Sequence, residues 1–272
     1  MDKVHLEVEN LKTYFFTRRG VVKAVDGVSF SVNQAQTFGL VGESGCGKSV
    51  SCLSILRLVP EPAGRIVGGR ILLGGENLLE KTEEKMRKIR GSRISMILQD
   101  PMTSLNPVFT IGDQLFEALQ LHRHLKGQSL LDRGKELLKK VGIASPEFRL
   151  RNYPHELSGG MKQRVVGAIA LSCEPHLLIC DEPTTSLDVT IQAQYLSLLK
   201  ELQQQAGLTM IFVTHDFGIV ARMCDRVGVM YAGRMVEVAD CRELFNNPTH
   251  PYTKALMSSV PKLDEGGKAA QH

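Results

Sequence analysis

A glycine-rich stretch near the N-terminus has the composition of a phosphate-binding loop. The segment GESGCGKS, residues 42–49, follows the spacing G-x-x-x-x-G-K-[ST] and lies between a short apolar run and a run with helical spacing. Its glycines let backbone N–H groups turn inward around phosphates, and the following helix start adds partial positive charge. A chance glycine-rich turn is the alternative, but both flanks favour phosphate binding. The predicted binding residues are Gly42, Ser44, Gly45, Cys46, Gly47, Lys48 and Ser49.

Two side chains of this loop and two acids further along the chain have separate predicted roles. Lys48 should reach the β- and γ-phosphates of a nucleotide, and the Ser49 hydroxyl should ligate Mg²⁺. The segment LLICDE, residues 177–182, has the pattern of a buried strand that ends in two carboxylates. Because neighbouring side chains on a strand point in opposite directions, Asp181 suits the Mg²⁺ shell and Glu182 the polarisation of an attacking water. A solvated acidic strand end is the alternative, which the phosphate loop disfavours.

The segment LSGGMKQRV, residues 157–165, has the features of a second anion-binding helix start. Ser158, Gly159 and Gly160 precede an amphipathic run and could offer donors to a phosphate, but no acidic residue for a metal lies among them. The alternative for Ser158 is an ordinary helix N-cap. An N-cap does not explain two glycines at positions that favour helix formers.

The pattern around these motifs predicts an α/β fold. Alternating residues predict antiparallel strands within residues 4–16 and 21–32, and a further strand and turn at 69–79. Residues 109–154 are helical in pattern and poor in strands, which predicts an inserted helical subdomain. The later elements alternate and predict a mostly parallel sheet covered on both faces, with helices at 160–173, 190–204 and 217–224 and strands at 176–181, 209–216 and 226–239.

Composition excludes several classes of protein. The 272 residues include 33 basic and 29 acidic side chains, a net charge of +4 that does not indicate a nucleic-acid partner. No apolar run approaches the roughly 20 residues that cross a bilayer, and the N-terminus is unlike a secretion signal, so we expect a cytosolic chain. Its six cysteines form no C-x-x-C pair, which favours reduced thiols over a zinc site or disulfides.

The motifs resemble those of ABC transporter ATPase subunits over nearly the whole chain. In chain order they are GESGCGKS, LQDP with Gln99, LSGGM, LLICDEP, SLD at residues 186–188 and VTHD with His215. Each motif alone is weak, but six in the family's order form a specific signal. The resemblance implies a P-loop NTPase of ABC type, with a mixed sheet core, an antiparallel β subdomain and an inserted helical subdomain, and it implies ATP and Mg²⁺ as cofactors.

The resemblance also implies an ATP-bound dimer, in which each nucleotide lies between the phosphate loop of one subunit and the LSGGM motif of the other. Ser158, Gly159 and Gly160 would then donate to a γ-phosphate whose lysine and metal come from the partner. This arrangement would explain why one chain carries two anion-binding helix starts.

Further roles follow from the resemblance alone. Gln99 would contact the metal or the lytic water, His215 would contact the γ-phosphate, and Asp188 would help organise the dimer interface. Adenine would stack on an aromatic residue of TYFF, for which Tyr14 fits best. Phe16 is the alternative stacking residue, and a core aromatic is the structural alternative.

Two positions depart from the family pattern or raise a question. Met161 stands where many members have glutamine, so a polar ribose contact from this position is in doubt. Cys46 lies within the phosphate loop, where any small residue could be tolerated. The alternative hypothesis is that the loop amides and Lys48 lower the pKa of its thiol and make ATPase activity sensitive to thiol reagents.

Three segments resemble the oligopeptide, dipeptide and nickel import ATPases: LFNNPTHPYTKALMSSVP at residues 244–261, QDPMTSLNP and DEPTTSLDVTIQAQ. This branch implies an ATPase on the inner face of the cell membrane that powers a binding-protein-dependent importer for di- or oligopeptides. Nickel or another small solute is the alternative cargo. The implied partners are a second ATPase subunit, identical or related, two membrane permeases that meet the helices of 109–156, and indirectly an extracytoplasmic binding protein. Many relatives carry a cysteine-rich tail for an iron–sulfur cluster, and we expect no cluster here.

These observations predict the domain boundaries and two rival functions. We expect an ABC ATPase domain over 1–262, with the insertion at about 105–160, the importer-like segment at 244–262 and a disordered tail at 263–272. One rival is a soluble ABC ATPase of DNA repair or ribosomes, which the lack of a coiled coil or second cassette disfavours. The other is a nucleotide switch without hydrolysis, which Glu182 disfavours.

Overall fold

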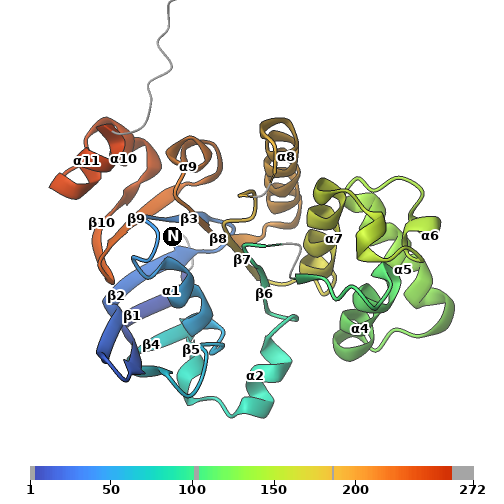
Figure 1. Ribbon diagram of the computed structural model, residues 1–272, viewed down its shortest axis with the longest axis horizontal. Coiled ribbons are helices and arrows are strands. Elements are labelled where there is room, and N and C mark those ends of the chain that lie inside the picture. The colour runs from blue at the N-terminus through green and yellow to red at the C-terminus, as the bar shows by residue number, and fades with distance from the viewer. Residues whose placement is uncertain (1–3, 101–103, 186, 259–272) are drawn as a thin grey trace, which may run out of the picture.

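The computed structural model describes residues 4–100, 104–185 and 187–258 and contains two sheets (Figure 1). The first sheet is antiparallel, with strand order β2-β1-β4-β5. A tight turn joins β1 to β2, where Thr17 pairs with Gly20. The expected antiparallel strands at the N-terminus are therefore confirmed. The strands are β1 (Val4–Thr17), β2 (Gly20–Asn33), β4 (Gly64–Leu73) and β5 (Glu76–Asn77).

The second sheet is mixed and forms the centre of the molecule, with order β10-β9-β3-β8-β7-β6. The five strands β9, β3, β8, β7 and β6 are parallel to one another, and β10 is antiparallel to β9. Every residue of β3, β7 and β8 is buried, as expected for strands covered on both faces. The strands are β3 (Thr37–Val41), β6 (Ile94–Ile97), β7 (Leu177–Asp181), β8 (Thr209–Thr214), β9 (Arg226–Tyr231) and β10 (Arg234–Asp240).

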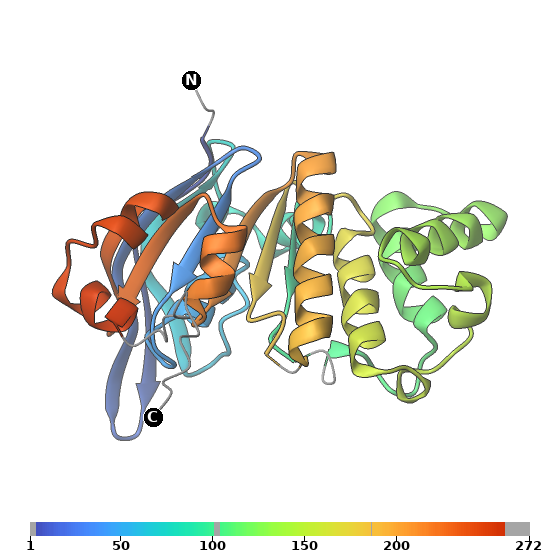
Figure 2. The same ribbon diagram turned by 90° about the horizontal axis from the view of Figure 1, so that it is seen from above.

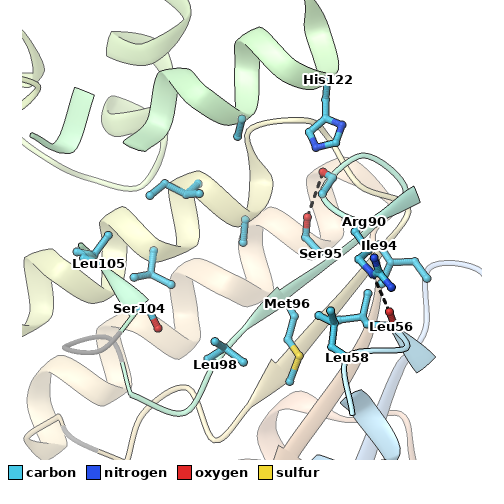
Figure 3. A pocket seen from close by; sticks show the side chains of 15 residues that line it. Leu56, Leu58, Arg90, Ile94, Ser95, Met96, Leu98, Ser104, Leu105 and His122 are labelled. Atoms are coloured by element: carbon cyan, nitrogen blue, oxygen red, sulfur yellow. Dashed lines mark hydrogen bonds between the residues drawn. The ribbon is translucent and has the colours of Figure 1, made fainter. Parts of the chain in front are cut away.

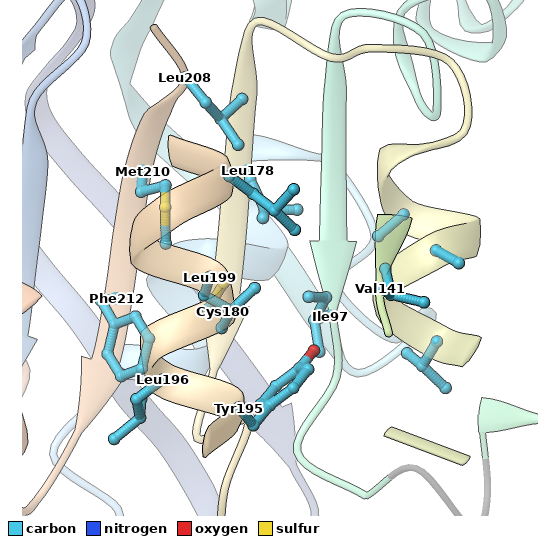
Figure 4. Close-up of a cluster of buried hydrophobic side chains, with 14 of the residues drawn as sticks. Ile97, Val141, Leu178, Cys180, Tyr195, Leu196, Leu199, Leu208, Met210 and Phe212 are labelled. Atoms are coloured by element: carbon cyan, nitrogen blue, oxygen red, sulfur yellow. The ribbon is translucent and has the colours of Figure 1, made fainter. Parts of the chain in front are cut away.

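Alternation along the central strands divides the apolar side chains between two cores. Leu178 and Cys180 of β7 belong to one core, and Leu177 and Ile179 belong to the other. In the first core, helix α8 (Val189–Ala206) directs Tyr195, Leu196 and Leu199 toward the side chains of β7 and β8 (Figure 4). The second core lies between the central sheet and the antiparallel sheet.

Three helices begin at or directly after predicted motifs. Helix α1 begins at Lys48 within the glycine-rich motif, α7 begins at the first glycine of LSGG, and α9 follows β8. Their bounds are α1 (Lys48–Ile55), α7 (Gly159–Leu171) and α9 (Phe217–Met223). The helix and strand over 83–97 that lead toward Gln99, α2 (Glu83–Ile89) and β6, are elements that sequence analysis did not predict.

The helical insertion projects from one end of the molecule (Figures 1 and 2). A capping box at Thr110 and Asp113 begins its first helix, in which Asp113 also complements the helix dipole. Residues 104–156, all of which the structure describes, contain helices and no strand. The elements are α4 (Ile111–Arg123), α5 (Gly127–Lys140), α6 (Pro146–Arg149) and the 3-10 turn η2 (Pro154–Glu156).

Two short helices complete the described chain at the opposite side, beside β9 and β10 (Figure 1). They are α10 (Cys241–Asn246) and α11 (Pro251–Ser258). A 3-10 turn, η1 (Leu78–Glu80), follows β5. The expected tail at 263–272 lies outside the described residues. None of the helices in the described ranges has the length and apolar character needed to cross a membrane.

Candidate functional site

The glycine-rich loop connects β3 to α1 and has a backbone that requires glycine at two positions. Gly42 has φ 148° and Gly47 has φ 107°, both in the region that favours glycine. A Cβ at Gly42 would lie 2.2 Å from the Met230 carbonyl oxygen, and one at Gly47 would lie 2.2 Å from that of Ala24. The loop is therefore pressed against β9 on one side and β2 on the other.

Lys48 is buried inside this loop and its ammonium has carbonyl partners. Its Nζ donates to the Gly42 oxygen at 2.7 Å and to the Glu43 oxygen at 2.8 Å. In the described chain, no carboxylate lies within ion-pair distance of this ammonium. A buried cation without an ionic partner is suited to bind an anion that enters the loop.

The Ser49 hydroxyl donates to Asp181 Oδ1 over 3.0 Å. Burial raises the pKa of Asp181, while the hydrogen bond from Ser49 lowers it. Serine and carboxylate oxygens are hard donors, and Mg²⁺ prefers a small number of them together with phosphate and water oxygens. The pair therefore fits a magnesium ion that a bound nucleotide would bring.

Glu182 follows Asp181 and lies at the centre of a polar cluster. Its carboxylate accepts from Gln99 Nε2 at 3.2 Å and from Thr185 Oγ1 at 3.2 Å, and His215 Nδ1 lies 3.4 Å from Oε1. Glu182 has φ 45°, unusual for a residue with a side chain, and its amide donates to Val213 at the end of β8. The two adjacent acids thus have separate partners, but β7 ends at Asp181, so the turn at Glu182 and not strand alternation separates them.

A cavity of about 230 Å³ joins the loop to this cluster. It is lined by Ala24, Ser44, Gly45, Gly47, Lys48, Ser49, Val50, Gln99 and Glu182. Sequence reasoning missed Ala24, Val50 and the Glu182 partner Thr185. Ala24 comes from β2, far from the loop in the chain, and no motif around it indicates a binding residue. Thr185 could have been noticed as a hydroxyl three residues after Glu182, in the turn that leaves the strand.

The LSGG segment does not line this cavity. Ser158 is the N-cap of α7, and its Oγ accepts from the Met161 amide at 3.4 Å. A Cβ at Gly160 would lie 2.7 Å from Ile191 Cγ2, so close packing against α8 explains that glycine. A Cβ at Gly159 would meet nothing within 4 Å, so packing within the chain does not require glycine there. The Met161 side chain packs against the first core.

Asp188 and the aromatic candidates also lie outside the cavity lining. Asp188 caps α8 by accepting from the Ile191 amide at 3.0 Å, whereas Ser186 of the same motif lies outside the described residues. The Tyr14 hydroxyl donates to Asp26 Oδ1 at 2.7 Å, and this bond raises the pKa of Tyr14. Phe16 is exposed and lies 5.6 Å from the Arg65 guanidinium. The stacking role of either aromatic stays a prediction.

The hypothesis of an acidic Cys46 thiol is wrong. Burial raises the pKa of Cys46, and the nearby Lys48 ammonium only partly opposes this effect. The thiol is 6% exposed and packs in the second core. A small apolar side chain that fills space under the loop is the role that this environment supports.

Comparison with protein families gives two matches. Residues 25–185 match the model described as ABC transporter, and residues 236–272 match the one described as oligopeptide/dipeptide transporter, C-terminal region. The chain is similar to a probable peptide ABC transporter ATP-binding protein, y4tR, of Sinorhizobium fredii, with 54% identity over 96% of this chain and 78% of the relative. It is 52% identical to the dipeptide transport ATP-binding protein DppD of Bacillus subtilis, over 98% of this chain and 79% of the relative.

Solved structures show the same fold. A dimeric ATP-binding cassette in a post-hydrolysis state, bound to ADP and Pi, superposes with a TM-score of 0.78 at 23% identity, over 87% of this chain and 99% of the other. The protein cbiO1 of Clostridium perfringens, part of an ABC transporter complex, has a TM-score of 0.76 at 30% identity, over 91% of this chain and 92% of the other.

Proposed function

The chain belongs to the ABC transporter family, and we propose on this basis that it is the ATP-hydrolysing subunit of an importer for dipeptides or oligopeptides. The observation that carries the proposal is the convergence of Lys48, the Ser49–Asp181 pair and the Glu182 cluster on one cavity. The peptide cargo is supported by the family match at the C-terminal end and by the names of the relatives.

The geometry supports a division of labour in hydrolysis. Lys48 and the loop amides would hold the β- and γ-phosphates, and Ser49 and Asp181 would hold Mg²⁺, which supplies charge neutralisation at the phosphates when bound. Glu182 would accept a proton from the attacking water. Gln99 and His215, which contact the Glu182 carboxylate, would orient that water and the γ-phosphate.

Gln99→Ala is expected to lower kcat for ATP hydrolysis about three- to tenfold, the value of one partly exposed hydrogen bond, and to leave the KM for ATP unchanged. The amide would no longer hold Glu182 toward the water. Steady-state phosphate release measures both constants. Gln128→Ala, which removes an exposed amide on α5, is the control and should match the wild type. A Gln99→Ala protein with unchanged kcat would exclude this role.

The second anion-binding helix start supports a dimer as the active form. The residues at the N-terminus of α7 do not line the chain's own cavity, and a Cβ at Gly159 would meet nothing within 4 Å. A second ATPase subunit, identical or related, would place its nucleotide there, and the half-site would donate to the γ-phosphate. Ser158, Gly159, Gly160 and Asp188 would belong to this interface.

A groove beside Gln99 is suited to a permease partner. A cavity of about 350 Å³ lies among the end of α1, β6, α4 and α7 (Figure 3). Leu58 and Leu98 line it and are 48% and 46% exposed, and His122 reaches it from the helical insertion. Because Leu98 precedes Gln99, an apolar segment seated here would act directly on the Glu182 cluster. We place the chain on the inner face of the membrane, where two permeases would receive cargo from a binding protein.

The proposed function is tested with the ATPase reconstituted in liposomes with its two permeases and peptide-loaded binding protein. ATP-dependent accumulation of peptide is expected. Leu58→Glu should lower accumulation at least about tenfold, because a charge would enter an apolar interface, and should leave ATP binding intact. Val67→Glu, at an exposed apolar position on β4, is the matched control. Accumulation of nickel without peptide would contradict the cargo, and equal loss of ATP binding in Leu58→Glu would contradict the groove.

A further inference from the structure

The segment between β10 and α11 is anchored by one carboxylate. Glu237 of β10 accepts from the Thr249 amide at 2.7 Å, from the Thr249 hydroxyl at 2.8 Å and from the His250 amide at 3.0 Å. Partial burial acts to raise the pKa of Glu237, but interactions with Thr253, Thr249 and His250 outweigh it and lower this pKa to about 2. The anchor is therefore charged at every physiological pH.

The anchor determines where the first turn of α11 lies. The Tyr252 amide donates to His250 Nδ1 at 3.2 Å, and the next residue, Thr253, is fully buried. Glu237 also places a negative charge near the N-terminus of α11, which the helix dipole favours. The contacts of Glu237 and the burial of Thr253 thus fix the backbone position of Tyr252, which lies close to the end of the described chain.

Tyr252 reaches the phosphate loop. Its hydroxyl accepts from the Glu43 amide at 3.2 Å, across 209 positions of sequence. The carbonyl of the same peptide unit, on Gly42, accepts from Lys48 Nζ at 2.7 Å. The Gly42–Glu43 peptide is thus held at its nitrogen by the C-terminal segment and at its oxygen by the lysine predicted to bind phosphate.

The end of β9 and the turn that follows it contact both Tyr252 and the phosphate loop. The ring of Tyr231 lies 4.4 Å from that of Tyr252, with an angle of 46° between the planes. Two residues further, the Gly233 amide donates to the Cys46 carbonyl at 2.9 Å. Figure 1 shows α11 on the side of the molecule that holds β9 and β10. The loop is therefore contacted at Glu43 and Cys46 by elements from the last part of the described chain.

We propose that Tyr252 is a positioning residue for nucleotide binding, which Glu237 holds in place and which orients the Gly42–Glu43 peptide before a triphosphate arrives. This inference rests on the proposed ATPase function. A loop already in its binding conformation loses less conformational entropy on binding, so Tyr252 acts on affinity and not on the chemical step. The segment matched as the oligopeptide/dipeptide C-terminal region, which includes both residues, thereby contributes to the nucleotide site.

Tyr252→Phe keeps the ring and removes the acceptor of the Glu43 amide. We expect the KM for ATP and the dissociation constant for MgATP to rise about three- to tenfold, as for one lost hydrogen bond, with kcat changed less than twofold. Tyr231→Phe is the matched control, because within the described residues its hydroxyl makes no hydrogen bond, and it should equal the wild type. A Tyr252→Phe protein with unchanged KM and MgATP affinity would overturn the inference.

A double-mutant cycle tests whether Glu237 acts through Tyr252. Glu237→Gln should raise the KM for ATP in the same way, and adding it to Tyr252→Phe should have less than the multiplied effect of the two single changes. Multiplicative effects, or a loss of kcat at constant KM, would refute this link. A wild-type protein that does not bind MgATP would refute the proposed function itself, so the two failures are distinct.

Discussion

Glu182→Gln is expected to lower kcat for ATP hydrolysis about a thousandfold, within the range found for loss of a general base. The variant is also expected to form a stable ATP-bound dimer. Glutamine keeps the size of the side chain and an oxygen that can accept from Gln99 and Thr185. It cannot accept a proton from water. ATP would therefore bind between two subunits and remain there, since in the proposed mechanism hydrolysis would separate them.

The dimer is measured by light scattering in saturating MgATP, and hydrolysis by phosphate release. Gly159→Asp in the Glu182→Gln background tests the second half-site. The added side chain meets open space within its own chain, and an acid in the first turn of a helix is favourable for folding. Its charge would nevertheless repel the partner's γ-phosphate, so this double variant should stay monomeric.

The control is Ser129→Asp in the same Glu182→Gln background, which places the same charge in the first turn of α5. This double variant should still dimerise as Glu182→Gln alone does. If Glu182→Gln stayed monomeric in saturating MgATP, the shared nucleotide site would be refuted for this chain. Dimers of the Gly159→Asp double variant would refute the role of the α7 start alone.

Lys48→Ala is expected to lower kcat/KM for ATP at least about a hundredfold, as loss of a preorganised charged contact to the transferred phosphate does. Lys48 Nζ has only carbonyl oxygens as oxygen partners in the described structure, so its ammonium can turn to a phosphate without breaking an ion pair. Steady-state phosphate release measures kcat/KM, titration calorimetry with MgATP measures the loss of binding, and circular dichroism confirms that the variant is folded. Lys88→Ala, at an exposed position on α2, should bind as the wild type. Wild-type affinity in Lys48→Ala would contradict the assignment of the loop.

Sequence was sufficient for elements whose signal is local. The patterns of β7 and β8 predicted buried strands because both faces are covered and nearly every side chain is apolar. The glycine spacing predicted the loop because the backbone at Gly42 and Gly47 admits no side chain. By contrast, β6 has only four residues and α2 buries only Met86 and Ile89, so neither carries a clear periodic pattern, and both were missed.

The amino-acid sequence by itself predicted the chemistry of this protein: a phosphate loop, two acids at the end of a buried strand and a second helix start suited to an anion. Their residue types and spacing are local properties of the backbone. Only the tertiary structure decided which distant groups support them. Ala24 against Gly47, Ile191 against Gly160 and Tyr252 on the Glu43 amide join segments far apart in the chain. Such contacts depend on how whole elements pack, and no short stretch of residues specifies them.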